Sequence, residues 1–204
     1  IAVKPQMMQE ALPTLQAMGG GETVFLSVAA GISIGTYEDI LGSNSPILRA
    51  MPNTPAAIGQ GITALIGNAV STADHIDLAH ALLSAIGEVV DLDSENQMDA
   101  VTGVSGSGPA YVFYMIDALA KAGEAQGLSP DLAMQLAKAT VAGAGALAKA
   151  SEETPEQLRI NVTSPNGTTQ AGLEVLMDKN AGLTPLIGGT VAAATMRSKE
   201  LSNG

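Results

Sequence analysis

Three polar segments interrupt an otherwise apolar chain, and the first, residues 99–111, combines hydroxyl groups with a glycine-rich turn. Thr102 and Ser105 offer hydroxyls, and the Gly/Ser stretch that follows enters a predicted helix at Pro109. The first turn of a helix leaves backbone N–H groups without intrahelical partners, so this segment can bind a polar or anionic ligand. The same residues are equally compatible with a tight turn where two helices cross.

The second segment, residues 161–169, predicts a binding site for a carboxylate. It joins a Ser-Pro-Asn-Gly turn to the pair Thr168 and Thr169 at the start of a predicted helix. Free amides and hydroxyls at a helix N-terminus stabilise negative charge, so this segment can hold an anion without a dedicated arginine. The alternative interpretation is an ordinary Ser/Thr helix cap.

The third segment, residues 49–55, follows a predicted strand and contains two prolines around Asn53 and Thr54. In open α/β sheets, ligands bind beyond the carboxyl ends of the strands. Residues 2–5 and 28–31 follow other predicted strands and are expected at the same edge. The alternative interpretation is a rigid proline turn.

The composition excludes several other kinds of chemistry. The chain has no cysteine, which excludes a disulfide scaffold, a cysteine-ligated zinc and a cysteine nucleophile. Its histidines, His75 and His80, lie in a polar helical stretch, which favours a solvated or structural role, and no metal site is expected. Nine Lys and Arg in a chain of net charge −11 argue against a nucleic-acid partner. No apolar run is long enough to span a bilayer, so we expect a soluble, cytoplasmic protein.

The elements that must position these segments differ between the two halves of the chain. Up to residue 93, β-rich runs alternate with helical stretches, which predicts an open α/β sheet. The expected strands are 1–3, 23–29, 47–51, 62–66 and 88–92, and the expected helices are 6–18, 31–40 and 72–86. After residue 93 only helices are predicted, over 109–126, 130–150, 168–179 and 184–201, with a capping signature at 154–157. Small residues at close-packing spacings in this half, among them Gly123 and Gly143, favour a homodimer interface over a tight monomeric bundle.

Five short motifs, in this order, are similar to those of pyrroline-5-carboxylate reductases, and the resemblance covers essentially the whole chain. The motifs are VKP at 3–5, VAAG at 28–31, RAMPNTP at 49–55, the segment 99–111 with TGVSGSGPAY, and SPNGTT at 164–169. The resemblance implies an α/β Rossmann-like dinucleotide-binding domain, truncated at its amino terminus, over residues 1–93. An all-α substrate-binding and dimerisation domain over residues 94–204 follows.

The resemblance also implies an activity and an assembly. The activity is reduction of Δ1-pyrroline-5-carboxylate to L-proline, the last step of proline biosynthesis, with NADPH as cofactor and NADH as the alternative. The assembly is a homodimer through the helical domain, within a larger ring such as a decamer.

Individual residues take their roles from the same resemblance. Thr102 is expected beside the ring nitrogen as the catalytic residue, where it orients the nitrogen and relays its proton. The substrate-binding residues are expected to be Glu95, Asn161, Ser164, Gly167, Thr168 and Thr169, with Glu152 as a further candidate. The cofactor-binding residues are expected to be Ala2, Val3, Lys4, Pro5, Val28, Ala29, Ala30, Asn53 and Thr54.

The chain departs from the family where the cofactor phosphates would bind. It has no G-x-G-x-x-G followed by a helix, and its first residues resemble the middle of a buried strand. We therefore expect a missing amino-terminal segment of roughly 60–70 residues, two βα units at about 30 residues each, and an exposed strand edge at residues 1–3. The alternative function is a non-catalytic dimerising fragment that keeps the carboxylate site. A third choice, a hydroxyacid dehydrogenase, would need a catalytic lysine that cannot be placed.

Overall fold

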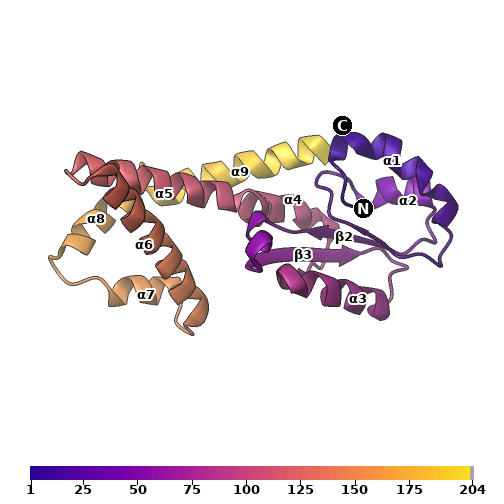
Figure 1. Cartoon of the computed structure of the whole chain (residues 1–204), viewed down its shortest axis with the longest axis horizontal. Coiled ribbons are helices and arrows are strands. Elements are labelled where there is room, and N and C mark those ends of the chain that lie inside the picture. The colour runs from indigo at the N-terminus through magenta and orange to yellow at the C-terminus, as the bar shows by residue number, and fades with distance from the viewer. Residues whose placement is uncertain (203–204) are drawn as a thin grey trace. The chain divides into compact units, whose positions relative to one another are not determined.

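The computed structural model describes residues 1–202, apart from the Pro5 side chain, and these residues form two compact units (Figure 1). Unit 1 is Ile1–Pro109 together with the chain from Val191 onward, and unit 2 is Ala110–Thr190. The sequence predicts one boundary at 93/94, whereas the contacts divide the chain after residues 109 and 190. The reason is that the segment carrying Thr102 and the last turns of the final helix both pack into unit 1.

Unit 1 is built on a four-stranded sheet of strand order β1-β2-β3-β4. The strands are β1 (Phe25–Ser27), β2 (Ile47–Met51), β3 (Gly61–Gly67) and β4 (Gly87–Asp91). The pairs β1–β2 and β3–β4 are parallel, whereas β2 and β3 are antiparallel. Residues 1–3, expected as a strand, form no ladder strand, because a 3-10 turn begins at Pro5 and leaves them too short. They still run beside β1, since the Val28 N–H donates to the Ile1 carbonyl.

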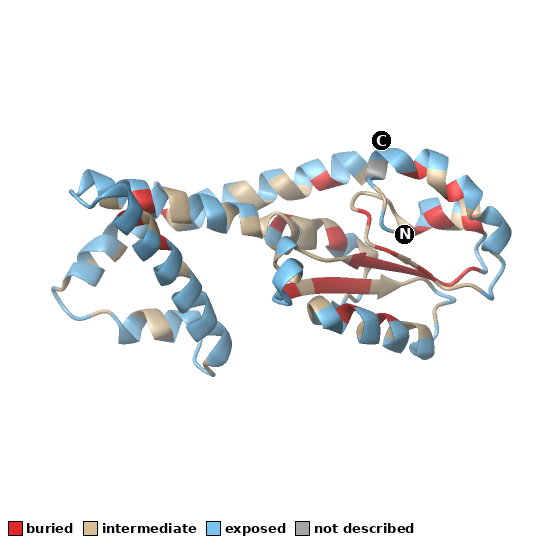
Figure 2. Ribbon diagram, viewed as in Figure 1, coloured by how far each residue is buried: buried red, intermediate tan, exposed pale blue. Residues whose placement is uncertain are grey.

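Helices cover both faces of this sheet, as a Rossmann-like domain requires. On one face, α1 (Met8–Thr14) and α2 (Ile34–Leu41) pack against Ile47, and on the other α3 (Ala73–Leu83) packs against Leu48. Successive residues of a strand point to opposite faces, so the apolar run of β2 fills both layers. Figure 2 shows the buried residues concentrated in the strands and on the helix sides that meet them.

Short connecting elements complete unit 1. They are the 3-10 helices η1 (Pro5–Met7), η2 (Gln16–Met18), η3 (Thr54–Ile58), η4 (Ser84–Ile86) and η5 (Glu95–Gln97), then α4 (Met98–Val101) and the π-helical η6 (Thr102–Gly106). The carboxyl-terminal part of α9 (Leu183–Ser202) packs on α4 and η6, where the Ser198 hydroxyl donates to Asp99 Oδ1 at 2.7 Å. This contact holds the end of the chain beside the Thr102 segment.

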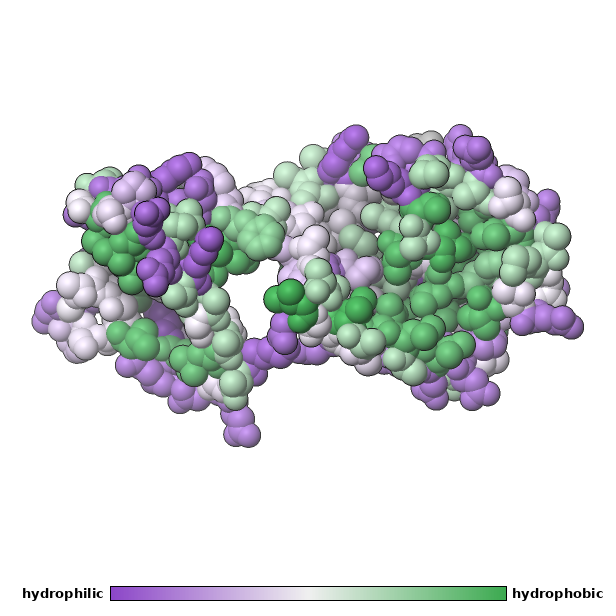
Figure 3. Space-filling view, viewed as in Figure 1, coloured by the Kyte–Doolittle hydropathy of each residue, from purple (hydrophilic) through white to green (hydrophobic). Residues whose placement is uncertain are grey.

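Unit 2 contains only helices among its described residues, as predicted. They are α5 (Gly108–Ala125), α6 (Pro130–Ala150), α7 (Pro155–Asn161), α8 (Thr168–Leu176) and the start of α9. Its small core joins α5 and α6 through Ala120, Ala133 and Ala137. Large aromatic side chains remain at its surface, including Phe113 at 62% and Tyr114 at 75% exposure. Figure 3 shows green, hydrophobic patches on the surface of this unit. Across residues 1–202, the helices are all too short or too polar to cross a bilayer.

Candidate functional site

A cavity of about 910 Å³ lies within unit 1 and brings together residues from distant parts of the chain. Its walls come from the start of the chain through α1, the β1–α2 loop, α2, η6 and the last turns of α9. Two of the predicted site residues, Ala30 and Thr102, line it. Known small-molecule sites occupy about 300–1,000 Å³, so this cavity has the size of a ligand site.

The β1–α2 loop contributes a wall of small residues to this cavity. Ala30, Gly31 and Ile32 line it, and Gly31 has a φ of 75°, a left-handed conformation that favours glycine. The neighbouring residues Val28 and Ala29 continue directly from β1.

The predicted cofactor residues at the start of the chain follow Ile1, which lies beside β1. Ile1 hydrogen-bonds with the backbone of Leu26 and Val28. Ala2 and Lys4 are exposed there and Val3 is half-buried. The Pro5 side chain lies outside the described structure.

Thr102 begins the π-helical turn η6, and its hydroxyl is already committed as a donor. Thr102 Oγ1 donates to the Met98 carbonyl at 2.9 Å, and the Ser107 N–H donates to the Thr102 carbonyl at 2.8 Å. π-helical turns are rare and often occur at functional sites. Because its proton is given to the Met98 carbonyl, the Thr102 hydroxyl can bind a further group only as an acceptor, through its oxygen lone pairs.

The proline-rich turn after β2 is tied to this same segment. The Asn53 side chain donates to the Ser105 carbonyl at 3.3 Å and accepts from the Ile62 N–H at 3.0 Å. Both ends of its amide therefore have partners within the chain, which indicates that Asn53 fixes the position of η6. Thr54, the first residue of η3, is exposed.

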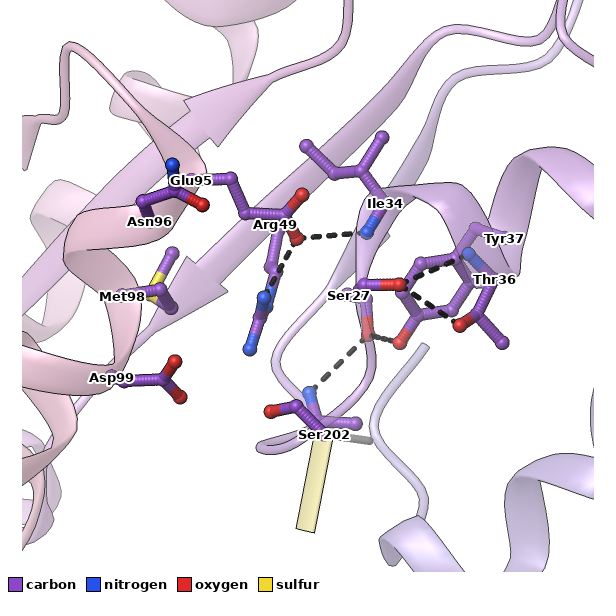
Figure 4. Close-up of polar contacts among 12 residues, drawn as sticks. Ser27, Ile34, Thr36, Tyr37, Arg49, Glu95, Asn96, Met98, Asp99 and Ser202 are labelled. Atoms are coloured by element: carbon purple, nitrogen blue, oxygen red, sulfur yellow. Dashed lines mark hydrogen bonds and ion pairs between the residues drawn. The ribbon is translucent and has the colours of Figure 1, made fainter. Parts of the chain in front are cut away.

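Glu95, predicted in the substrate pocket, forms two strong contacts inside unit 1. Its Oε1 accepts from Arg49 Nη1 at 2.7 Å and from the Ile34 N–H at 2.8 Å (Figure 4). Arg49 lies in the middle of β2 and is 5% exposed, so Glu95 neutralises a buried charge. Its contact with the substrate stays a prediction.

The predicted carboxylate site belongs to unit 2 and centres on the start of α8. Thr168 and Thr169 are the first residues of the helix, and their side chains are exposed. Gly167 is the N-cap residue; its backbone is extended, and it forms no side-chain cap hydrogen bond. A Cβ on Gly167 would lie 3.1 Å from the Ser164 carbonyl oxygen, a tight approach that favours a small residue there. Asn161 instead donates to Glu153 Oε2 at 2.9 Å and accepts from Gln157, which fixes α7.

The histidines have the structural roles that the sequence favours. The Nδ1 of His75 accepts from the Thr72 N–H in a capping box, and His80 Nε2 lies 2.8 Å from Asp91 Oδ1. In the described part of the chain, the acidic and histidine side chains gather into no group of three able to hold a metal ion.

Sequence reasoning missed the structural partner of Glu95 and the contribution of α9. A single arginine inside the apolar run 47–51 was the available signal, because a buried charge needs a partner. Ser198 and Arg197 of α9 line the cavity. No local pattern places α9 there, since the helix lies about 90 residues beyond η6 and joins it only through tertiary packing.

Known proteins resemble this chain over nearly all of its length. A family profile described as pyrroline-5-carboxylate reductase dimerisation matches residues 95–201. A pyrroline-5-carboxylate reductase of Synechocystis sp. is 46% identical over 201 residues, which are 98% of this chain and 73% of the relative.

Solved structures give the same result. A pyrroline-5-carboxylate reductase from Coxiella burnetii superimposes with a TM-score of 0.92 at 39% identity, over 98% of this chain and 74% of that one. The Plasmodium falciparum pyrroline carboxylate reductase, solved with NADP bound, gives a TM-score of 0.87 at 31% identity, over 98% and 75% of the two chains.

Proposed function

The chain belongs to the pyrroline-5-carboxylate reductase family, and we propose that its reaction takes place at the cavity of unit 1. The reaction is the NADPH-dependent reduction of Δ1-pyrroline-5-carboxylate to L-proline. The single observation that carries the location is that Thr102 and the small residues of the β1–α2 loop line one cavity of ligand size. The relatives that match nearly the whole chain are reductases, which disfavours the alternative of a non-catalytic fragment.

The residues present fit the nicotinamide end of the cofactor. The loop from Ala29 to Gly31 carries no side chain larger than a methyl group, so a flat ring can lie close to its backbone. When bound, the reduced nicotinamide supplies the hydride for the imine carbon. Ala2, Val3 and Lys4, which belong to the segment that begins beside β1, and Val28, which follows β1, are proposed to line the cofactor on the side away from Thr102.

Thr102 is proposed to orient the ring nitrogen by accepting a hydrogen bond from it. A protonated imine carries an N–H donor and is already electrophilic, so hydride addition leaves a neutral ring amine and needs no strong side-chain acid. The Thr102 oxygen suits this donor, because its own proton is given to the Met98 carbonyl. To relay a proton instead, the hydroxyl would first have to break that bond, so positioning is the role that the geometry favours.

For the substrate carboxylate, we keep the first turn of α8 as the proposed site. Thr168, Thr169 and the glycine at the cap position present hydroxyls and backbone amides at the positive end of a helix dipole. Ser164 belongs to the preceding turn and contributes its hydroxyl. Asn161, which is bonded to Glu153, is proposed to act only by holding α7 in place.

The chain forms homodimers, as the dimerisation profile of its family indicates. The exposed apolar side chains of unit 2, such as Phe113 and Tyr114, suit a subunit interface. We further propose that dimers assemble into a larger ring such as a decamer.

The test is NADPH oxidation and proline formation by this chain, compared with Thr102→Val and Thr102→Ser. The valine variant keeps the shape of the side chain but loses the acceptor oxygen, and we expect its kcat to fall about 10–100-fold, whereas the serine variant keeps most of the activity. Absence of proline formation by the unmodified chain would contradict the proposed function. Equal kcat values for valine and wild type would contradict the role of Thr102 alone.

A further inference from the structure

The β1–α2 loop is held at both of its ends by one polar cluster, in which Ser27, Tyr37 and Arg49 are buried and Glu95 is half-buried. At the start of the loop, the Ala29 N–H donates to Ser27 Oγ at 3.2 Å. At its end, the Ile34 N–H donates to Glu95 Oε1 at 2.8 Å. The residues between these two bonds include Ala30, Gly31 and Ile32, which line the cavity. The two bonds therefore fix the path of a cavity wall from outside the cavity.

The groups that accept these bonds are themselves locked by buried partners. Ser27 Oγ lies 2.6 Å from the hydroxyl of Tyr37, which is fully buried, and Glu95 pairs with the buried Arg49 (Figure 4). In the parallel register of β1 and β2, Ser27 stands opposite Arg49, so both side chains point to the same face of the sheet. Burial raises the pKa of Tyr37, and therefore its hydroxyl remains protonated and able to donate. The four side chains form one cluster beneath the loop.

Glu95 also links this loop to the segment that carries Thr102. It lies in η5, which continues through α4 directly into η6. The Glu95 carboxylate thus accepts a hydrogen bond from the first turn of α2. The backbone that follows Glu95 leads to Thr102, the proposed catalytic residue. A shift of Glu95 would move two walls of the cavity relative to each other.

We propose that Glu95 and Tyr37 are positioning residues for the nicotinamide dinucleotide, acting through the backbone of the β1–α2 loop rather than by touching the ligand. This inference rests on the proposed function, since it assigns the loop to the cofactor. A residue that only stabilised the fold would weaken all parts of unit 1 equally. A positioning residue changes the loop and cofactor affinity and leaves the rest of the unit intact.

The experiment uses Tyr37→Phe and Glu95→Gln in the full chain, because both keep the shape of the side chain. Glu95→Ala is avoided, since it removes the hydrogen-bond acceptor of Arg49 together with its counter-charge and can prevent folding, whereas glutamine keeps an acceptor oxygen. The matched control is Glu22→Gln, the same substitution as in Glu95→Gln but at an exposed turn.

Two measurements are made on each variant. Hydrogen exchange of the backbone amides is followed without cofactor, and the Kd for NADPH is measured by equilibrium titration. We expect the Ile34 amide in Glu95→Gln and the Ala29 amide in Tyr37→Phe to exchange about tenfold faster, while amides of β3 exchange as in wild type. The Kd for NADPH should rise about tenfold in both variants. In Tyr37→Phe, kcat at saturating NADPH and the KM for pyrroline-5-carboxylate should stay within about twofold.

The outcomes separate this inference from the proposed function. NADPH binding by wild type with an unchanged Kd in both variants would overturn the inference and leave the function standing. Exchange that rises equally in the loop and in β3 would also overturn it, because the cluster would then be merely structural. Failure of the unmodified chain to bind NADPH would overturn the function and the inference with it.

Discussion

The substitution Gly103→Ala should destabilise unit 1, because this glycine stands where η6 meets α9. A Cβ at this position would overlap the Thr195 hydroxyl and lie 3.1 Å from the Val191 carbonyl oxygen. Overpacking costs about 1–3 kcal/mol, and alanine in place of glycine recovers about 0.5–1 kcal/mol by lowering the entropy of the unfolded chain. The midpoints of these ranges give an expected net loss of about 1.3 kcal/mol, which for a chain of this size lowers Tm by about 3–5 °C.

A double-mutant cycle with Thr195→Ala tests this cause directly. Removing the Thr195 hydroxyl takes away the worst overlap, so Gly103→Ala should cost about 1 kcal/mol less in that background. Gly35→Ala is the matched control, since a Cβ there meets only the Ser33 hydroxyl, at an ordinary 3.8 Å. Urea unfolding at one protein concentration measures all four free energies of unfolding. Additivity of the two substitutions within about 0.3 kcal/mol would refute the packing explanation.

Three other substitutions test the carboxylate site, the buried phenol and the sheet. Thr168→Val should raise the KM for pyrroline-5-carboxylate about tenfold without changing the NADPH Kd, because a hydrogen bond to a charged group contributes about 1.5–3 kcal/mol; an unchanged KM would exclude that hydroxyl. Burial raises the pKa of Tyr37 above its ordinary value of 10.0. At pH values between 10.0 and the pKa of Tyr37 in the folded chain, the phenol is therefore deprotonated in the unfolded chain and protonated in the folded one. Stability should therefore fall as pH rises above about 10, and Tyr37→Phe should lessen this fall in urea unfolding; equal slopes would contradict it. Asn68→Ala should cost about 2–4 kcal/mol, because the side chain hydrogen-bonds two backbone groups and two side chains; a thermal shift near zero would show that these bonds contribute little.

Local patterns were sufficient to predict most elements of this fold. The apolar run 47–51 coincides with β2, because a strand covered on both faces needs apolar residues in succession. The capping signature predicted at 154–157 is confirmed, since the Thr154 side chain accepts from the N–H group of Gln157 at the start of α7. Such signals act over a few residues and need no knowledge of the rest of the chain.

The pairing of elements was beyond the reach of those patterns. Nothing local distinguishes the antiparallel pairing of β2 with β3 from the parallel pairing expected of strands joined by helices. Glu95 is 46 residues from Arg49 in sequence, so no local pattern predicts their ion pair. From the sequence alone, a glutamate next to a glycine-rich segment is readily interpreted as a ligand-binding residue. The site residues that the resemblance supplied stay predictions, which the substitutions at Thr102 and Thr168 test.

The scarcity of conventional catalytic side chains in this chain explains why buried groups outside the cavity matter for its chemistry. A protonated imine accepts hydride readily once its carbon is aligned with the hydride-bearing carbon of the nicotinamide. Orientation alone can lower the activation barrier by about 7–11 kcal/mol. That contribution depends on backbone positions in the β1–α2 loop and in η6, which Glu95 and Asn53 hold through hydrogen bonds. A change at Asn53, which holds η6, should therefore lower kcat, as a change in the Thr102 oxygen does, whereas a change that only loosens the β1–α2 loop should raise the Kd for NADPH.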